Sequence, residues 1–249
     1  MFATVATRIL VAGVTAALII VGSPTRSQAD PIVPGWDLFQ TMSGTHFNGI
    51  PFLGVPLVTH DFDGVGVRQT FQTDTIMRRV DSVSSPSGVT GLVLEALQLR
   101  SVAPDATSGQ FLFITLQSIR GGPASTGSMT VSFGPGGTSG SFSSFFDVFF
   151  DVRLGSLDGT IVLSSTDHFS ADGSWSQGSA PRAVRIPGVN TFPNGGGSGD
   201  FFPDIVDEEA LLARHKAGPA EVPEPASLLL VGAGLLGVAA RARNRRART

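Results

Sequence analysis

Two short stretches of this 249-residue chain bring together side chains that can do chemistry. The first, His60-Asp61-Phe62-Asp63-Gly64, places an imidazole and two carboxylates close together, and Asp61 and Asp63 share a face if the segment is extended. These are metal-ligand types, but calcium takes about six to eight oxygens, and neither a third acid nor a terminal Glu follows at loop spacing. We therefore expect a polar turn whose acids accept backbone hydrogen bonds, with a metal site as the alternative.

The second stretch, from Asp167 to Trp175, contains acid, imidazole, hydroxyl and indole groups. Ser-His-Asp hydrolases assemble these groups from distant positions rather than neighbouring ones. Ser170 also lacks the Gly-x-Ser-x-Gly setting of a nucleophile elbow. Asp172-Gly173 is more typical of a hairpin turn. The pattern disfavours catalysis here and leaves a sugar contact through Trp175 as an alternative.

Other carboxylates lie within apolar or alternating segments. Glycoside hydrolysis needs two of them about 5–9.5 Å apart in a cleft. Glu95 lies inside an apolar run, so beside Arg100 or another cation it is expected to be structural. Asp147 and Asp151 alternate with apolar residues and are expected on a solvated strand face. The sequence thus predicts no catalytic residues and no enzyme, and a polysaccharide-modifying hydrolase remains the least supported alternative.

The most distinctive chemistry lies in the last 28 residues, from Val222 onward. Pro223 and Pro225 fix their own backbone and restrict the residue before each, which presents Glu224 in an extended, protease-accessible form. The segment Ala226–Ala240 is apolar or small apart from one serine. As a helix it would be about 22 Å long, shorter than the ~30 Å hydrocarbon core.

A cluster of arginines follows this apolar run and is expected to remain on the cytoplasmic side of a membrane. The run therefore predicts a short transmembrane helix over 226–240, with everything before Pro225 outside. Gly232–Gly237 spells a dinucleotide-binding pattern, but it lacks the strand and the later acidic residue that such sites need, so no cofactor is predicted. The arginines of the basic end are Arg241, Arg243, Arg245, Arg246 and Arg248.

In this order, a Pro-Glu-Pro triplet, an apolar helix and an Arg-rich end, the tail resembles the PEP-CTERM sorting signal of Gram-negative bacteria. The sorting motif within it is Val222-Pro223-Glu224-Pro225, and the resemblance covers residues 222–249 alone. It implies recognition and cleavage by an exosortase, a membrane-embedded cysteine transpeptidase. It also implies export to the cell surface or matrix and a link with exopolysaccharide.

The other end of the sequence has the pattern of a secretory signal peptide over residues 1–29. Arg8 supplies the positive region, Ile9–Val21 is apolar, Pro24 breaks the run, and small residues precede a cleavage expected after Ala29. Signal peptidase is therefore an expected partner, and the body begins near Asp30.

Composition limits the functions that the body can have. From Asp30 to Pro225 there are ten Lys/Arg and twenty Asp/Glu, a net charge of −10. Nucleic-acid binding is disfavoured because no basic patch is present to neutralise phosphates. The chain has no cysteine, so an exported domain must be held by its core or by bound ions. Eighteen Phe against two Trp and no Tyr favour core filling over recognition.

Short runs with period-two alternation, separated by Gly, Ser and Pro, predict an all-β body. The clearest is Phe142–Leu154, and a β-sandwich or jelly-roll-like domain over 30–200 is expected. Asp30–Pro56, with four prolines, is expected to be irregular. A short helix is predicted over Pro203–Lys216, within a helix-and-spacer segment at 201–221.

Together these patterns predict an exported, non-enzymatic protein that an exosortase sorts and processes. It would pass through an inner-membrane intermediate to the cell surface or extracellular matrix. A structural role linked to exopolysaccharide and biofilm is favoured. The alternative is a carbohydrate-binding module that uses Trp36 or Trp175.

Overall fold

The computed structural model describes residues 30–178, 182–191, 201–205 and 215–222. This part of the chain is built from strands, and its one helical element is the 3-10 turn η1 (Gln117–Arg120). The expectation of an all-β fold is confirmed. The strands are β1 (Gly35–Thr41), β2 (His46–Phe47), β3 (Ile50–Gly54), β4 (Val58–Phe62), β5 (Gly66–Phe71), β6 (Thr75–Arg79), β7 (Ser87–Ser101), β8 (Leu112–Leu116), β9 (Ser125–Phe133), β10 (Ser139–Leu154), β11 (Thr160–Ser176), β12 (Phe202–Ile205) and β13 (Ala217–Pro219).

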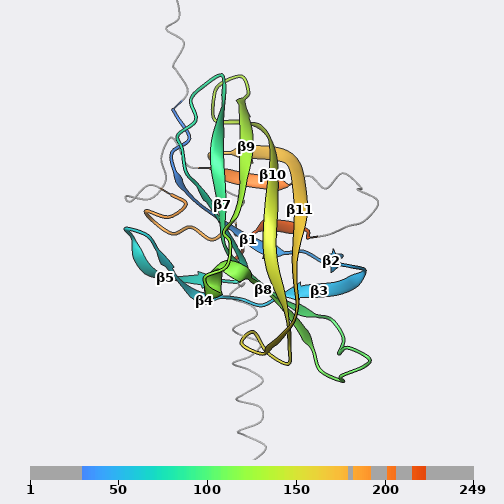
Figure 1. The fold of residues 1–249 in the computed structure, drawn as a ribbon. Coiled ribbons are helices and arrows are strands. Elements are labelled where there is room, and N and C mark those ends of the chain that lie inside the picture. Colours follow the sequence, from blue (N-terminus) through green and yellow to red (C-terminus); the bar gives the residue numbers. More distant parts are fainter. Residues whose placement is uncertain (1–29, 179–181, 192–200, 206–214, 223–249) are drawn as a thin grey trace, which may run out of the picture.

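The long strands β7, β9, β10 and β11 form the front layer of the molecule in Figure 1. β9 and the shorter β8 lie end to end between β7 and β10: β9 pairs with both at one end, and β8 pairs with both at the other. β10 and β11 pair along nearly their whole length, with a single register irregularity after Val152. This arrangement gives the front layer a long, regular outer face.

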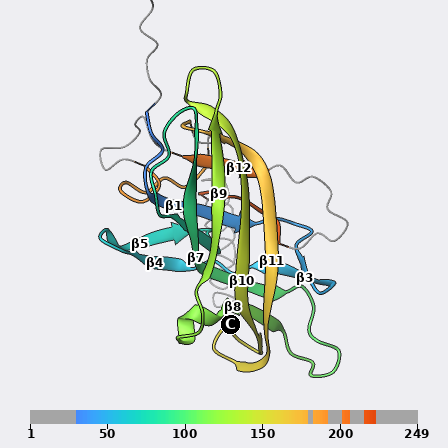
Figure 2. The same cartoon turned by 45° about the horizontal axis from the view of Figure 1, so that its top comes forward.

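The same sheet turns back to form the second layer. Its main path is β12-β11-β10-β8-β7-β6-β1-β13, and Figures 1 and 2 show β1 and β12 behind the long strands. The layers therefore belong to one 11-stranded sheet, whereas two separate sheets would make a simple sandwich. The hairpin β4–β5 stands apart as a two-stranded sheet.

Alternating apolar residues of the long strands fill the space between the layers. On β10, Phe142, Val148 and Phe150 are buried, as period two predicts. Aromatic rings meet edge to face in this core; the ring centroids of Phe47 and Phe150 are 5.6 Å apart. A second, smaller apolar cluster joins β1, the β4–β5 hairpin and the loop at 182–191.

The expectation of an irregular segment over residues 30–56 is wrong, because β1, β2 and β3 lie there. β1 pairs with β6 on one edge and β13 on the other, and its residues Gly35–Phe39 are all buried. A strand covered on both faces shows no polar alternation, so period two could not reveal it.

The helix and spacer expected over residues 201–221 also need correction. Phe202–Ile205 is strand β12, which pairs with the end of β11, and Ala217–Pro219 is strand β13. Residues 206–214 lie outside the described part of the chain. The sheet therefore extends past the expected domain boundary at residue 200, because these late segments complete its two ends.

Candidate functional site: the docked C-terminal segment

The segment His215–Val222 attaches to the open edge of β1. β13 runs antiparallel to β1 and places Thr41 opposite Ala217 and Phe39 opposite Pro219. Two further backbone bonds extend the pairing: Met42 N–H donates to the Lys216 carbonyl at 2.9 Å, and Ala220 N–H donates to the Leu38 carbonyl at 2.9 Å. The segment thus continues the sheet beyond β1.

After β13 the chain changes its hydrogen-bonding partner. Val184 N–H donates to the Ala220 carbonyl at 2.7 Å, and Val222 N–H donates to the Arg182 carbonyl at 2.9 Å. Between these bonds Ala183 faces Glu221 in an antiparallel bridge. The backbone is therefore held to the body as far as Val222, the residue that precedes Pro223.

The attached segment presents small side chains to the body. Ala217, Gly218 and Ala220 are buried, and Ala220 joins the second apolar cluster beside residues such as Leu38 and Val184. Alanine and glycine bury far less apolar surface than the Phe and Leu residues of the main core. Attachment of this segment therefore depends mainly on backbone hydrogen bonds.

A buried polar group precedes β13. Thr75 Oγ1 donates to Asp74 Oδ1 at 2.8 Å and lies 3.3 Å from His215 Nε2. Burial lowers the pKa of His215 to about 4 and raises the pKa of Asp74 above its ordinary value. The imidazole of His215 is therefore neutral at pH 7.

The predicted sorting residues lie at and beyond the end of this segment. Val222 is the last described residue, and its side chain is exposed. Among the described residues no helix is long and apolar enough to cross a bilayer. Outside them lie Ala29, Pro223, Glu224, Pro225, the apolar run 226–240, Arg241, Arg243, Arg245, Arg246 and Arg248.

Glu95 is structural, with Arg78 rather than Arg100 as its cation. Arg78 Nε donates to Glu95 Oε1 at 2.5 Å, and Trp36 Nε1 donates to Oε2 at 2.7 Å. Burial raises the pKa of Glu95, but the hydrogen bonds, including that from His60, outweigh it and hold the pKa below its usual value. The Trp36 side chain is buried, so it offers no ring for stacking on a sugar.

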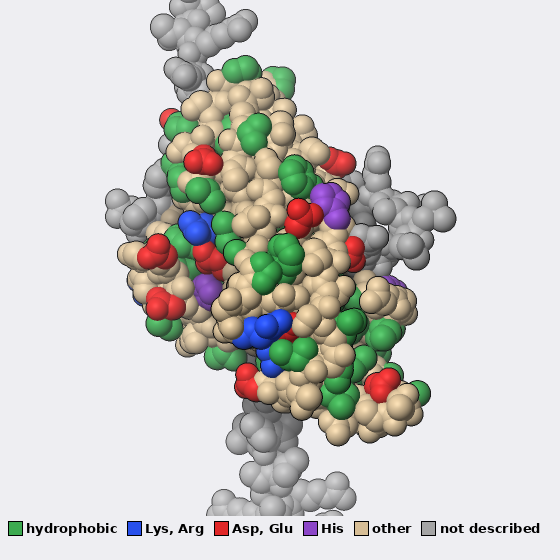
Figure 3. Space-filling model, viewed as in Figure 1, with side chains coloured by type: hydrophobic (Ala, Val, Ile, Leu, Met, Phe, Trp, Pro, Cys, Tyr) green, Lys and Arg blue, Asp and Glu red, His purple; other side chains and the backbone are tan. Residues whose placement is uncertain are grey.

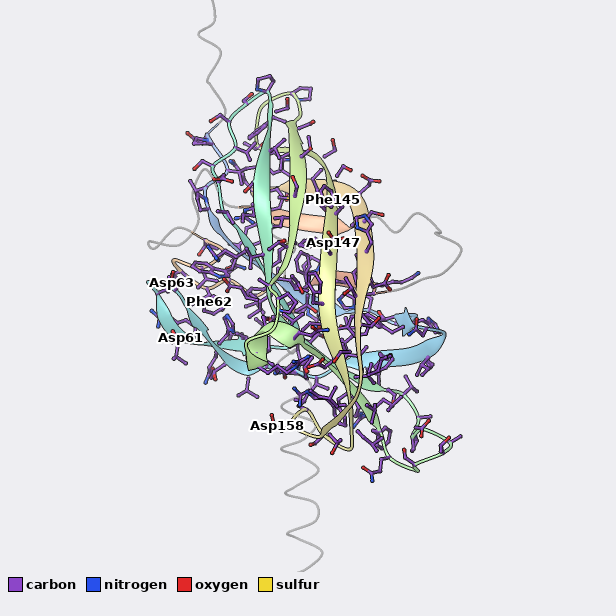
Figure 4. All side chains as sticks on the ribbon, viewed as in Figure 1. Asp61, Phe62, Asp63, Phe145, Asp147 and Asp158 are labelled. Atoms are coloured by element: carbon purple, nitrogen blue, oxygen red, sulfur yellow. The ribbon has the colours of Figure 1, made fainter. Side chains whose placement is uncertain are left out.

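The acids of the first predicted stretch lie on the β4–β5 hairpin. Phe62 points into the second apolar cluster, while Asp61 and Asp63 are exposed. Figure 4 shows this hairpin well apart from Asp147 on β10. Within the described ranges, no three His, Cys, Asp or Glu side chains come close enough to hold a metal ion together.

The stretch Asp167–Trp175 forms most of strand β11. Asp172 and Gly173 pair with Ser143 and Phe142 of β10, so the predicted hairpin turn at this dipeptide is wrong. Trp175 is buried at 2% exposure and donates to the Ser132 carbonyl at 3.1 Å. The predicted sugar contact through Trp175 is wrong as well, because the indole belongs to the core.

Alternation along β11 brings His168 onto the outer face, opposite Asp147. His168 Nδ1 lies 2.8 Å from Asp147 Oδ1, and its ring stacks on Phe145 with centroids 5.7 Å apart. All three side chains are exposed. Figure 3 shows the surrounding face mainly in tan, which indicates polar, uncharged side chains and backbone. The sequence singled out His168 and Asp147, but not their pairing with Phe145.

Asp151 corrects the expectation of a solvated face. Its side chain is fully buried, although Asp147 four positions earlier is exposed as predicted. Arg120 Nε donates to Asp151 Oδ2 at 2.5 Å, and Ser164 Oγ donates to Oδ1 at 2.6 Å. These bonds hold the pKa of Asp151 below its usual value. Arg120 lies on η1, which sequence alternation did not predict.

A buried ion pair between Asp37 and Arg79 was missed entirely. Arg79 Nη1 donates to Asp37 Oδ1, and the guanidinium carbon lies 4.6 Å from the centre of the Phe201 ring. Burial raises the pKa of Asp37 to about 6, although Arg79 acts in the opposite direction. Because both residues lie on strands without polar alternation, their sequence context gave no signal.

A cavity of about 370 Å³ lies between β3, β8, β10 and β11. Its lining is mostly apolar and includes Phe52, Ile114, Phe150 and Val162. Asp105 is one of the few polar groups, and its carboxylate accepts hydrogen bonds from Thr107 and Ser108 in its own loop. The cavity opens to solvent, because Ile50, Val162 and Leu163 of its lining are exposed, and its lining brings together no acid–base pair.

Comparison with known families identifies the segment that follows the attached strand. Residues 221–246 match the family model described as the PEP-CTERM protein-sorting motif. The match begins at Glu221, inside the docked segment, and continues through the basic end. Neither the curated proteins nor the solved structures gave a match to this chain. The chain therefore carries a signal for exosortase-dependent sorting and export.

Proposed function

We propose that this protein is an exported structural component of the cell surface or extracellular matrix. A signal peptidase would remove residues 1–29, and the run 226–240 would hold an inner-membrane intermediate until an exosortase cuts near Pro223-Glu224-Pro225. The single observation that carries the proposal is the sorting motif at 221–246. The attached segment supports it, since the structured body continues to the edge of that motif.

A non-enzymatic role is supported by the state of the buried carboxylates. Asp37, Glu95 and Asp151 are each paired with an arginine and lie in separate parts of the sheet, while the buried Asp74 accepts hydrogen bonds from Thr41 and Thr75. Acids committed to ion pairs stabilise a fold and are poorly suited to general acid–base work. The net charge of −10 between Asp30 and Pro225 would keep such a body soluble in a hydrated polysaccharide matrix.

The proposal is tested by mass spectrometry of the protein recovered from the cell surface and medium. We expect a C-terminus near the Pro-Glu-Pro triplet and no peptide containing Arg248. Glu224→Ala should cause the full-length precursor to accumulate in the membrane, whereas Glu221→Ala, which removes only a half-exposed ion pair, should be processed normally. A surface protein that still carries Arg248 would contradict the proposal.

A second candidate, binding of the exopolysaccharide, is favoured by the outer face of β10 and β11. Phe145 is 46% exposed there, beside Asp147 and His168, in a field of Ser and Thr side chains. An exposed ring next to hydrogen-bonding groups is the composition that sugar contacts use. This version replaces the one based on Trp36 and Trp175, which are buried.

Affinity electrophoresis in gels containing the producing strain's polysaccharide tests this second candidate. We expect Phe145→Ala to lose retardation, whereas Phe71→Ala, which removes a 40% exposed ring from the separate hairpin, should keep it. Equal retardation of the wild type and both variants would exclude Phe145 as the contact. If the mobility of the wild type is the same with and without polysaccharide in the gel, this function is excluded.

A further inference from the structure

The distance between the folded body and the predicted membrane span is very short. Among the described residues, Val222 is the last one that is hydrogen-bonded to the body, and in the sequence the apolar run begins at Ala226. Only Pro223, Glu224 and Pro225 lie between them. Four Cα-to-Cα steps reach at most about 14 Å. With its C-terminal segment attached, the body would stand directly on the bilayer surface.

This geometry conflicts with access by a processing enzyme. Peptide-binding clefts hold their substrates extended and commonly bond to the substrate backbone. The residues just upstream of the triplet use their backbone groups for the body: Val222 N–H bonds to Arg182, and the Ala220 carbonyl accepts from Val184. The attached state therefore offers little more than the triplet itself.

The segment has little apolar surface to expose when it is released. Ala217, Gly218 and Ala220 carry little apolar surface, so their departure leaves no large void in the core. Gly218 packs against the flexible side chain of Met42, the residue that follows β1. A Cβ added to Gly218 would lie 3.0 Å from Met42 Sδ. Glu221 and Val222 are already about half exposed, so their release exposes little further surface and breaks one half-exposed ion pair, Arg182–Glu221.

We propose that residues 217–222 come off β1 and the 182–184 loop before an exosortase engages the Pro223-Glu224-Pro225 triplet. The inference rests on the proposed function, since it concerns the same cleavage. Release of six residues lengthens the tether from three residues to nine and frees their backbone for the enzyme's cleft. The attached segment is thus a gate on its own processing, and the substrate that the enzyme recognises extends upstream of the triplet.

The absence of cysteine from the chain allows a direct test by disulfide locking. Ala183 and Glu221 face each other in an antiparallel bridge, where opposed Cα atoms lie at distances that a disulfide can join. The variant Ala183→Cys/Glu221→Cys would tie the segment to the body two residues before Pro223. Oxidising conditions outside the cytoplasm favour formation of the bond.

A matched control lock joins Ser143→Cys and Asp172→Cys, an opposed, exposed pair on β10 and β11. Each single-cysteine variant controls for the substitution itself. We expect cells producing the Ala183–Glu221 lock to accumulate uncleaved precursor, at least tenfold above the control lock, and reductant to restore cleavage. Thermal unfolding of the purified bodies establishes that both locked proteins are folded.

The outcomes separate this inference from the function it rests on. If wild type and control lock are cleaved and the folded, oxidised Ala183–Glu221 lock is cleaved equally fast, the gating inference is wrong while exosortase processing stands. If the wild type itself is never cleaved, the proposed function fails. If the single variant Glu221→Cys blocks cleavage under reducing conditions, the side chain at 221 rather than attachment is responsible, which also overturns the inference.

Discussion

At the scale of single residues, burial of an acid on the outer face of β10 depends on whether a side chain from another element covers it. Asp147 and Asp151 have the same sequence context and lie on the same side of β10. Asp147 meets only the exposed His168, whereas Asp151 is covered by Arg120 of η1 and bonded by Ser164. Alternation with period two predicts on which side of the strand a residue lies, but it does not predict whether a group from another element covers that residue.

These two acids give a matched pair for mutation. Asp151→Asn is expected to lower the free energy of unfolding by about 2–3 kcal/mol, because it weakens charge-assisted bonds to Arg120 at a buried position. Asp147→Asn should change it by less than about 0.5 kcal/mol, since both it and His168 are exposed. Urea unfolding at pH 7 measures both, and equal effects would contradict the assigned burial.

The pH dependence of the Asp151 contribution has a definite sign. Its hydrogen bonds lower the pKa in the folded state, so the folded protein binds this proton less readily than the unfolded chain does. The stabilisation is present above the ordinary pKa of Asp, about 4, and is lost as the pH falls below it. In Asp151→Asn this part of the acid destabilisation should be missing.

At the scale of elements, the sequence predicted most clearly those strands that have one buried face and one solvent-exposed face. Phe142–Leu154 was predicted from its alternation and lies within β10. The sequence did not predict η1, β1, β12 or β13. Alternation could not identify β1, with both faces buried, while β12 and β13, of three or four residues, are too short to show a period.

The attached segment should loosen as the pH falls. Burial holds the pKa of His215 near 4, below its ordinary 6.5, so the folded state binds this proton less readily than the released segment. Attachment is therefore fully stabilised above about pH 6.5 and weakens from there toward pH 4. Of the groups packed nearby, Asp74 contributes with the opposite sign because burial raises its pKa.

Hydrogen exchange measures this effect at named amides. The Ala220 and Val222 amides, which bond to Leu38 and Arg182, should lose about fivefold in protection between pH 6.5 and pH 5.5, after correction for intrinsic exchange. Amides of β10 serve as the internal reference. His215→Gln should remove this loss of protection at lower pH, and a wild type whose protection stays constant would rule out this role for His215.

At the scale of the whole molecule, the last described residues are part of the stability of the body. A chain of residues 30–214 should be less stable than one of residues 30–222 by about 2–4 kcal/mol. The loss follows from the backbone bonds of β13 and the 220–222 segment, at roughly 0.5–1.5 kcal/mol each. Calorimetry compares the two, and a chain of 30–225 should match 30–222. Equal stability of the two shorter chains would show that attachment contributes nothing.

The sequence and the structure inform different parts of the candidate site. The sorting motif was predicted from residue order alone, because its composition is unusual, and the family comparison agrees. That Val222 is hydrogen-bonded to a loop 40 positions earlier in the chain could not be predicted, since it depends on long-range pairing. The tryptophan hypothesis failed for a related reason: burial of Trp36 and Trp175 is decided by the layers that cover them.

The pairing of β1 with β13 also determines when the body can finish folding during export. The Thr45 hydroxyl and the Lys216 carbonyl that it contacts are 171 positions apart, so this edge forms only after almost the whole body has crossed the membrane. In the proposed inner-membrane intermediate, the apolar run that begins at Ala226, ten residues after Lys216, would stop translocation just then. The membrane would thus hold the chain at the moment when its first and last strands meet. Because the pairing of these strands is long-range and slow, the hold would allow it to be completed before the protein is released.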